Sequence, residues 1–250
     1  MTSHPPQKCC TIGVKHEGEA TGTIKDIAGI STYVALPPSN SNSNAPTIAI
    51  LLLTDIFGHQ FPNNQLIADQ YALNGYLTLM PDLFHGDAIP IHRPADFDMD
   101  SWRKKHAFEH VDPIVRAMIG ELKGPLKVQR IGGVGYCFGA KFVTRFLTGE
   151  GGLEAGFVAH PSWVTAREVA GIEGPLGIAA AEIDGVFPPE KRHETEVILK
   201  ESGYPYQITL YSGVSHGFAV RGDLSNRQVL FAKEQAFYQA IAWFDEYIKK

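Results

Sequence analysis

The chain has 250 residues, of which 44% are hydrophobic and 20% are charged, and its formal net charge at pH 7 is −5. This length and composition predict one sizeable globular domain, and the acidic balance without a Lys/Arg cluster argues against a nucleic-acid partner. No apolar run approaches the ~20 residues of a membrane span, no secretory signal is evident and three cysteines make no disulfide framework, which together predict a cytoplasmic protein with no membrane partner.

The beginning of the chain differs in composition from the rest. Residues 1–22 are polar and contain glycine, which predicts an N-terminal arm that lies over the domain or is partly disordered, and residues 23–250 are predicted to form a single domain. Two short runs, Thr23–Ile27 and Thr32–Leu36, predict a hairpin. The Pro-, Ser- and Asn-rich residues 37–44 that follow predict a solvated loop.

Short aliphatic runs then alternate with helical patterns. The predicted strands are Thr47–Leu53, Tyr76–Met80, Val128–Gly133, Ala155–Ala159, Leu176–Ala181 and Tyr206–Tyr211. The predicted helices are Asn64–Asn74, one that opens near Asp100-Ser101, one that restarts at Asp112-Pro113, Phe138–Leu147 and Ala232–Ile248. Strands without polar alternation are typical of sheets that are covered on both faces. The alternation therefore predicts an α/β fold, with a doubly wound, mostly parallel sheet and helices on both faces.

The segment Gly135-Tyr136-Cys137-Phe138-Gly139 stands at a predicted junction between a strand and a helix. In the α/β-hydrolase fold, such a pattern is the nucleophile elbow, whose central residue lies on a strained turn. Glycine is needed on either side because a Cβ atom would collide with the chain as it folds back. A lone buried cysteine is usually only a small core residue, but the two glycines favour a nucleophile at Cys137.

An acid and a histidine follow Cys137 in the chain order that this fold uses. Asp184 comes just after one predicted strand, and His216 lies in the loop after another. An activated nucleophile needs a base and a group that orients the base. The order predicts a Cys137–His216–Asp184 triad, with a turn residue and a polar loop residue as the alternatives for the acid and the histidine.

The chain resembles the dienelactone hydrolase (carboxymethylenebutenolidase) family, most closely its fungal branch. The motifs that carry the resemblance are Gly135-Tyr136-Cys137-Phe138-Gly139, Asp184-Gly185-Val186-Phe187-Pro188, Ser215-His216-Gly217-Phe218, Thr54-Asp55-Ile56-Phe57-Gly58 and, in the arm, Cys9-Cys10 and His16-Glu17-Gly18. The resemblance implies an α/β-hydrolase that needs no cofactor or metal and acts on a small ester or lactone. It also implies an acyl-thioester intermediate on Cys137 and an oxyanion hole made by the backbone amides of Ile56 and Phe138. We expect a monomer or homodimer, and the sequence leaves the choice between them open.

Several positions depart from the pattern of the members that open dienelactone. Those members carry Glu at the position of Asp55, where the shorter side chain is not expected to contact Cys137. They also carry two substrate-clamping arginines, at the positions of Gly86 and Val220, with Arg221 one place later here. The residues predicted to bind substrate or tune the site are Asp55, Tyr136, His85, His160, Trp163 and Arg221. The alternatives are a turn cap for Asp55, a surface ion pair for Arg221 and simple packing for the others.

Two other functions are considered. The first is a small-molecule-binding protein on the same fold, against which the complete triad argues. The second is a zinc protease, because His106-Ala107-Phe108-Glu109-His110 matches the His-x-x-Glu-His pattern. That pattern also arises readily by chance in a polar helix. The glycines of residues 132–139 do not have the Gly-x-Gly-x-x-Gly spacing of a dinucleotide site.

Overall fold

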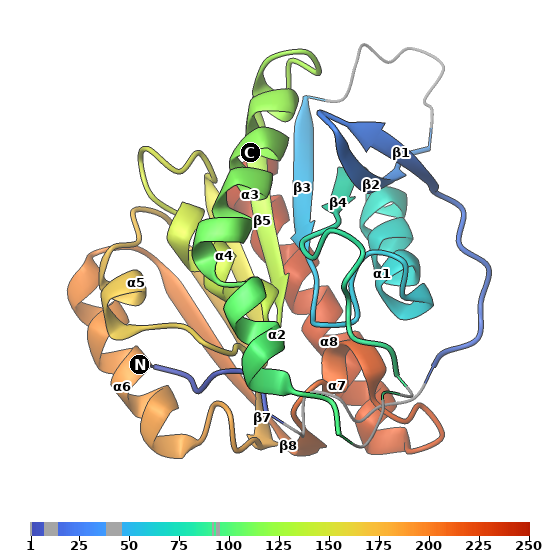
Figure 1. The fold of residues 1–250 in the computed structure, drawn as a ribbon. Coiled ribbons are helices and arrows are strands. Elements are labelled where there is room, and N and C mark those ends of the chain that lie inside the picture. Colours follow the sequence, from blue (N-terminus) through green and yellow to red (C-terminus); the bar gives the residue numbers. More distant parts are fainter. Residues whose placement is uncertain (1, 8–14, 39–46, 92, 94–95) are drawn as a thin grey trace.

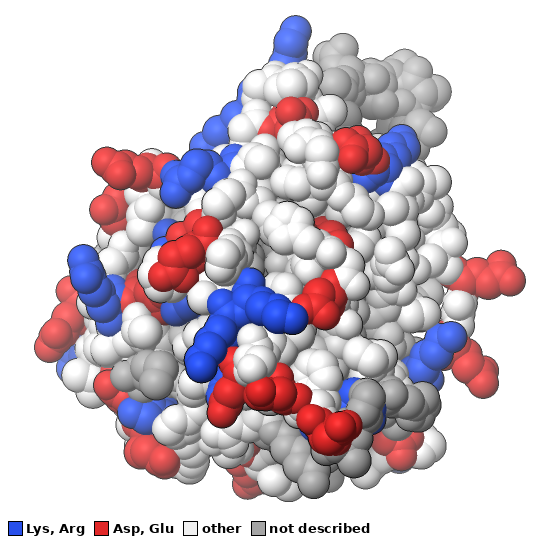
Figure 2. Space-filling view, viewed as in Figure 1, with Lys and Arg blue, Asp and Glu red and all other residues white. Residues whose placement is uncertain are grey.

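The computed structural model of this chain describes residues 2–7, 15–38, 47–91, 93 and 96–250. The Cys9-Cys10 pair and most of the predicted loop 37–44 lie outside the described residues. None of the helices in the described ranges is long and apolar enough to cross a lipid bilayer. Figure 2 shows acidic and basic side chains interspersed over one face of the molecule.

In the described residues, eight strands form one mixed sheet in the order β1-β2-β4-β3-β5-β6-β7-β8 (Figure 1). The strands are β1 (Thr23–Ile27), β2 (Ile30–Ala35), β3 (Ile48–Leu53), β4 (Leu77–Pro81), β5 (Arg130–Tyr136), β6 (Ala155–Ala159), β7 (Leu176–Ile183) and β8 (Tyr206–Ser215). Strand β2 is antiparallel to both of its neighbours, and every pair from β4 to β8 is parallel. The predicted mostly parallel sheet is confirmed.

Helices cover both faces of the sheet. They are α1 (Pro62–Leu73), α2 (Met99–Lys105), α3 (Phe108–Lys123), α4 (Gly139–Phe146), α5 (Ala166–Ala170), α6 (Pro189–Ser202), α7 (Phe218–Arg221) and α8 (Arg227–Phe244), which continues into a π-helical turn (Asp245–Lys249). In Figure 1, α3 and α4 lie in front of the sheet and α8 lies behind it. Helix α1 packs with α8, because the ring of Tyr71 lies 5.0 Å from that of Phe237.

The helix that was predicted to restart at Asp112-Pro113 begins earlier, at Phe108, and this boundary prediction is wrong. The Asp112 carboxylate does not cap a helix, because it binds Arg145, whose Nε donates to Oδ1 over 2.9 Å. Pro113 therefore stands inside α3. There it removes one hydrogen bond of the helical ladder, a cost that the buried apolar face of α3 offsets.

The turn between β5 and α4 is tightly confined. Cys137 has a φ of +50°, in the left-handed region that side-chain-bearing residues rarely adopt. A Cβ atom at Gly135 would lie 2.7 Å from the backbone nitrogen of Ala140, and one at Gly139 would collide with the carbonyl group of Leu53 in β3. The start of α4 thus packs directly on the end of β3, which is possible only with glycine at both positions.

Replacing Gly139 with Ala should lower the free energy of unfolding by about 3 kcal/mol, because the added methyl group meets backbone on a neighbouring strand. Gly120→Ala in α3 is the matched control, since nothing lies within 4 Å of its Cβ position. There, alanine should raise stability by up to about 1 kcal/mol through its higher helix propensity. Denaturant unfolding of the unmodified chain and the two variants measures both predicted changes in stability. Equal midpoints for Gly139→Ala and the unmodified chain would contradict this packing argument.

Candidate active site

The structure brings Cys137, His216 and Asp184 together at the carboxyl ends of β5, β8 and β7. His216 Nε2 lies 3.1 Å from Cys137 Sγ, and His216 Nδ1 lies 2.8 Å from Asp184 Oδ2. All three side chains are buried. A nucleophile, a base and an orienting carboxylate are thus linked in one chain of hydrogen bonds.

The turn after β7 fixes the Asp184 carboxylate. Its Oδ1 accepts hydrogen bonds from the backbone amides of Val186 (2.7 Å) and Phe187 (3.0 Å), which leaves Oδ2 for His216. Burial alone would raise the pKa of Asp184, but the hydrogen bonds from His216 and from the two amides, with the charge of His216, outweigh it and lower the pKa. Asp184 is therefore an anion at neutral pH.

His216 is held as a strong base. Burial by itself lowers its pKa, but the charge of Cys137 and the hydrogen bonds to Asp184 and Cys137 outweigh burial and raise the pKa to about 10. A proton on His216 is thus favoured when the neighbouring sulfur is a thiolate. The arrangement favours an imidazolium–thiolate pair over two neutral groups.

The backbone around Cys137 is anchored to the neighbouring strand. The Cys137 amide donates to the carbonyl oxygen of Ala159 (3.1 Å), and the Ser162 amide donates to the carbonyl oxygen of Cys137 (3.0 Å). In contrast, the amides of Phe138 and Ile56 donate no hydrogen bond to another group in the described part of the chain. Both amides are therefore available to an oxygen atom, and Phe138 stands at the N-terminus of α4, where the helix dipole favours negative charge.

Asp55 and Arg221 form a buried ion pair across the site. Arg221 Nη1 donates to Asp55 Oδ2 over 2.9 Å, and both side chains are almost fully buried. The Asp55 Oδ1 atom accepts from Asn64 Nδ2 (3.0 Å) and the Phe57 amide (3.2 Å). Burial raises the pKa of Asp55, an effect that the Arg221 charge partly reverses and the Cys137 charge reinforces. Arg221 is therefore buried, and the alternative interpretation of this residue as part of a surface ion pair is wrong.

The other predicted pocket residues lie in different surroundings. His160 is fully buried, its ring is 5.0 Å from that of His216, and burial lowers its pKa to about 4. The Trp163 ring lies 5.6 Å from the amine of Lys141. Tyr136 points into a separate cavity between α1 and α8, and His85 lies on an exposed turn. Of these four, only His160 contacts the histidine of the predicted triad.

A groove of about 700 Å³ opens beside His216 and Arg221. Gln7 of the N-terminal arm forms part of its wall. The arm is held there by backbone hydrogen bonds: His4 donates to Val186 (2.7 Å) and accepts from Trp163 (2.6 Å). The described arm residues 2–7 thus pack on the loops that carry Asp184 and Trp163.

The His-x-x-Glu-His pattern of residues 106–110, considered above as an alternative, does not lie on one helix. His106 lies between α2 and α3 and pairs with Asp87 over 3.0 Å, whereas His110 belongs to the first turn of α3. Within the described ranges, no group of three or more His, Cys, Asp or Glu residues is arranged to hold a metal ion.

Two residues near the reaction centre were not singled out from the sequence. Asn64 holds the Asp55 carboxylate, and Ser162 Oγ lies 3.6 Å from Cys137 Sγ. Asn64 is the first residue of a predicted helix, and nothing in the sequence marks it as part of the site. Ser162 belongs to His160-Pro161-Ser162-Trp163, a polar segment directly after a strand, and that position was the available signal.

A sheet in this strand order, with an elbow after β5 and an acid and a histidine after β7 and β8, defines an α/β-hydrolase fold. A solved structure of a putative dienelactone hydrolase from Klebsiella pneumoniae has this fold, with a TM-score of 0.72 and 16% identity over 91% of this chain and 98% of that one. The model of the dienelactone hydrolase family matches residues 30–248, and the chain belongs to that family.

Two fungal relatives cover the whole chain. It is 49% identical over 258 residues to hydrolase tropI of Talaromyces stipitatus, and 50% identical over 250 residues to hydrolase pyvD of Aspergillus violaceofuscus, with 100% of each chain covered. The family resemblance and the α/β-hydrolase fold predicted from the sequence are confirmed. The chain is an enzyme of the ester and lactone hydrolase class.

Breaking the buried Asp55–Arg221 pair should be costly, because either partner alone is left as an uncompensated buried polar group. Asp55→Asn and Arg221→Met should each lower the free energy of unfolding by about 3 kcal/mol, and the double variant should lose less than the sum. A double-mutant cycle by denaturant unfolding measures this coupling. The matched control is the half-exposed Lys191–Glu194 pair, whose coupling should stay below about 1 kcal/mol. Additive losses at Asp55 and Arg221 would show that the pair contributes nothing.

Proposed function

We propose that this chain hydrolyses a small ester or lactone by covalent catalysis. In this proposal Cys137 is the nucleophile, His216 is the general acid and base, and Asp184 orients the imidazole ring. The observation that carries the proposal is the hydrogen-bonded chain from the Cys137 sulfur through His216 to Asp184, at a left-handed strand–helix turn.

The first half of the reaction forms a thioester. The Cys137 thiolate attacks the carbonyl carbon of the substrate, and the carbonyl oxygen becomes an oxyanion. The amides of Ile56 and Phe138 would stabilise that oxygen. Both donors belong to the backbone and are already in place, so they need not reorganise as the charge develops. The imidazolium of His216 gives its proton to the departing alkoxide as the carbon–oxygen bond breaks, which leaves an acyl group on Cys137 and a neutral imidazole.

The second half releases the acid. Neutral His216 accepts a proton from water as that water attacks the thioester carbon. A second oxyanion forms and collapses, the carbon–sulfur bond breaks, and the products are the carboxylic acid and the thiolate–imidazolium pair. The Asp184 carboxylate stabilises the charged imidazole at each step without accepting its proton, because its own pKa is lowered.

The charges around the site favour an uncharged substrate. Gly86 and Val220 stand where dienelactone-opening members carry arginines, and Arg221 is engaged by Asp55 in the interior. We therefore propose a neutral ester or lactone that enters by the groove beside His216, without a carboxylate clamp. We also propose that the substrate is a small molecule, that the chain is a monomer or a homodimer, and that it is cytoplasmic.

The nucleophile is tested with p-nitrophenyl acetate. Steady turnover should be present, and Cys137→Ala or prior alkylation with iodoacetamide should abolish it, because no thioester can then form. A Cys9→Ala/Cys10→Ala double variant is the matched control, and it should keep both turnover and sensitivity to iodoacetamide. Turnover that survives Cys137→Ala would exclude the thiol mechanism. Absent turnover in the unmodified chain, with binding of the ester retained, would favour the small-molecule-binding alternative.

Asp184 should sustain the high pKa of His216. In Asp184→Asn the charge and the charge-assisted hydrogen bond are lost, so the pKa of His216 should fall from about 10 by about 1 to 3 units. NMR titration of the His216 ring in the two proteins measures the shift. Asp98→Asn, which removes the charge of an exposed carboxylate at the start of α2, is the control and should leave that titration unchanged. An unchanged His216 titration in Asp184→Asn would show that another group supports the base.

A further inference from the structure

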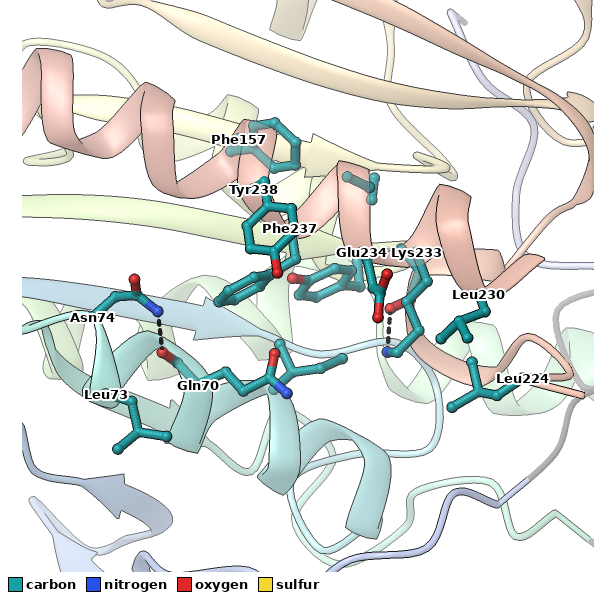
Figure 3. Close-up of a pocket in the computed structure, with 15 residues that line it drawn as sticks. Gln70, Leu73, Asn74, Phe157, Leu224, Leu230, Lys233, Glu234, Phe237 and Tyr238 are labelled. Atoms are coloured by element: carbon teal, nitrogen blue, oxygen red, sulfur yellow. Dashed lines mark hydrogen bonds between the residues drawn. The ribbon is translucent and has the colours of Figure 1, made fainter. Parts of the chain in front are cut away.

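A cavity of about 520 Å³ lies between α1 and α8, apart from the Cys137 site (Figure 3). Its walls are mostly apolar and include four aromatic residues, Tyr136 and Phe157 from the sheet and Phe237 and Tyr238 from α8. Among the residues that the structure describes, it shares no lining residue with the groove beside His216. Its volume falls within the range of about 300 to 1,000 Å³ that is typical of small-molecule sites.

One cationic side chain, Lys233, lines this cavity. The residue is half-buried, and its Nζ donates to the carbonyl oxygen of Ala219 over 2.8 Å. Within the described ranges, this amine makes no ion pair and no second hydrogen bond. An ammonium group has three donors. Lys233 thus has unused donors, and no anionic partner in the described part of the chain, at the wall of this cavity, where the carboxylate of a ligand can accept from them.

The charged and titratable groups around Lys233 do not supply that anion. Glu234 also lines the cavity but is exposed, and forms no ion pair with Lys233 in the described chain. The charge of Asp55 acts on Lys233 from a distance, but this carboxylate is bound by Arg221. Burial, with a smaller contribution from the charge of Lys233, lowers the pKa of His16, and a histidine carries no negative charge in either of its forms.

We propose that the cavity between α1 and α8 binds a small monocarboxylic acid with an apolar aromatic body. The carboxylate accepts hydrogen bonds from Lys233 Nζ, as a charge-assisted pair. The body packs against Tyr136, Phe157 and Phe237, with the side-chain amides of Gln70 and Asn74 at the α1 side of the cavity. The inference stands on this cavity alone and does not depend on the proposed thiol chemistry.

The protonation state of Lys233 makes the affinity of this cavity for an acid depend on pH. Burial lowers the pKa of Lys233 to about 8, against the opposing charge of Asp55. A bound carboxylate favours the ammonium form and so raises that pKa, which means that binding takes up a proton near pH 8. The affinity for an acid should therefore be greatest below pH 8 and fall as the pH rises above it.

The position of Lys233 also links the cavity to the reaction centre. Its hydrogen-bond acceptor, Ala219, lies in α7, between His216 and Arg221 in the chain. Tyr136, in the cavity wall, directly precedes Cys137. A ligand at Lys233 therefore contacts the two segments that carry the predicted nucleophile and base, while it lies outside the groove beside them.

The test uses 2-naphthoate as the probe and 2-naphthalenemethanol as its neutral counterpart, with binding measured by isothermal titration calorimetry on the full chain. At pH 7 the acid should bind at least about tenfold more tightly than the alcohol, and this preference should shrink by pH 9.5. Lys233→Met should bind both compounds equally, whereas Lys200→Met on the exposed surface of α6 should behave as the unmodified chain. Ala236→Leu, which fills the cavity, should weaken both compounds.

Alkylation of Cys137 with iodoacetamide separates this site from the reaction centre. Binding of 2-naphthoate should persist in the alkylated protein, whether or not the chain hydrolyses esters. The proposal is overturned if 2-naphthoate does not bind, if Lys233→Met binds it as tightly as the unmodified chain, or if alkylation of Cys137 abolishes its binding. The last result would place the ligand in the groove beside His216.

Discussion

The left-handed turn at Cys137 is the constraint on which the rest of the site depends. Backbone hydrogen bonds to Ala159 and from Ser162 hold it on one side, and the approach of Gly139 to the Leu53 carbonyl holds it on the other. These anchors are main-chain groups at the ends of β6 and β3, so the sheet itself positions the thiol. A non-glycine residue in this conformation costs about 1–3 kcal/mol of conformational free energy. The strained conformation persists only because several contacts of the surrounding structure hold it in place.

The buried pair of Asp55 and Arg221 joins two segments that the sheet alone does not tie together. Asp55 directly precedes Ile56, whose amide faces no protein acceptor in the described chain, and Arg221 closes the short helix after His216. Each charge is desolvated, so each depends on the other for its stability. The ion pair therefore helps to hold the loop after β3 and the segment after β8 in register, which relates the predicted oxyanion donor to the predicted base.

The sequence predicted those features that depend on residues close together in the chain. Short aliphatic runs indicated the parallel strands, and two glycines around a cysteine indicated the elbow. The start of α3 was missed because Asp112 binds Arg145, a partner 33 residues away, instead of capping a helix. The partnership of Asp55 with Arg221 spans 166 residues and left no local pattern. Tyr136 lies beside the nucleophile in sequence but faces the opposite side, because successive side chains of a strand alternate in direction.

The distribution of buried charge separates the reaction centre from the cavity between α1 and α8. Near the reaction centre, Arg221 is matched by Asp55 and Lys141 by Glu168, each within 3 Å, and His216 by Asp184. These cations are committed to carboxylates of the chain, so none is left to select an anionic substrate. Lys233 instead meets a carbonyl oxygen, which satisfies one donor but neutralises no charge. The cavity that we propose to hold an acid therefore lies at Lys233, and the groove that we propose for a neutral ester lies beside His216.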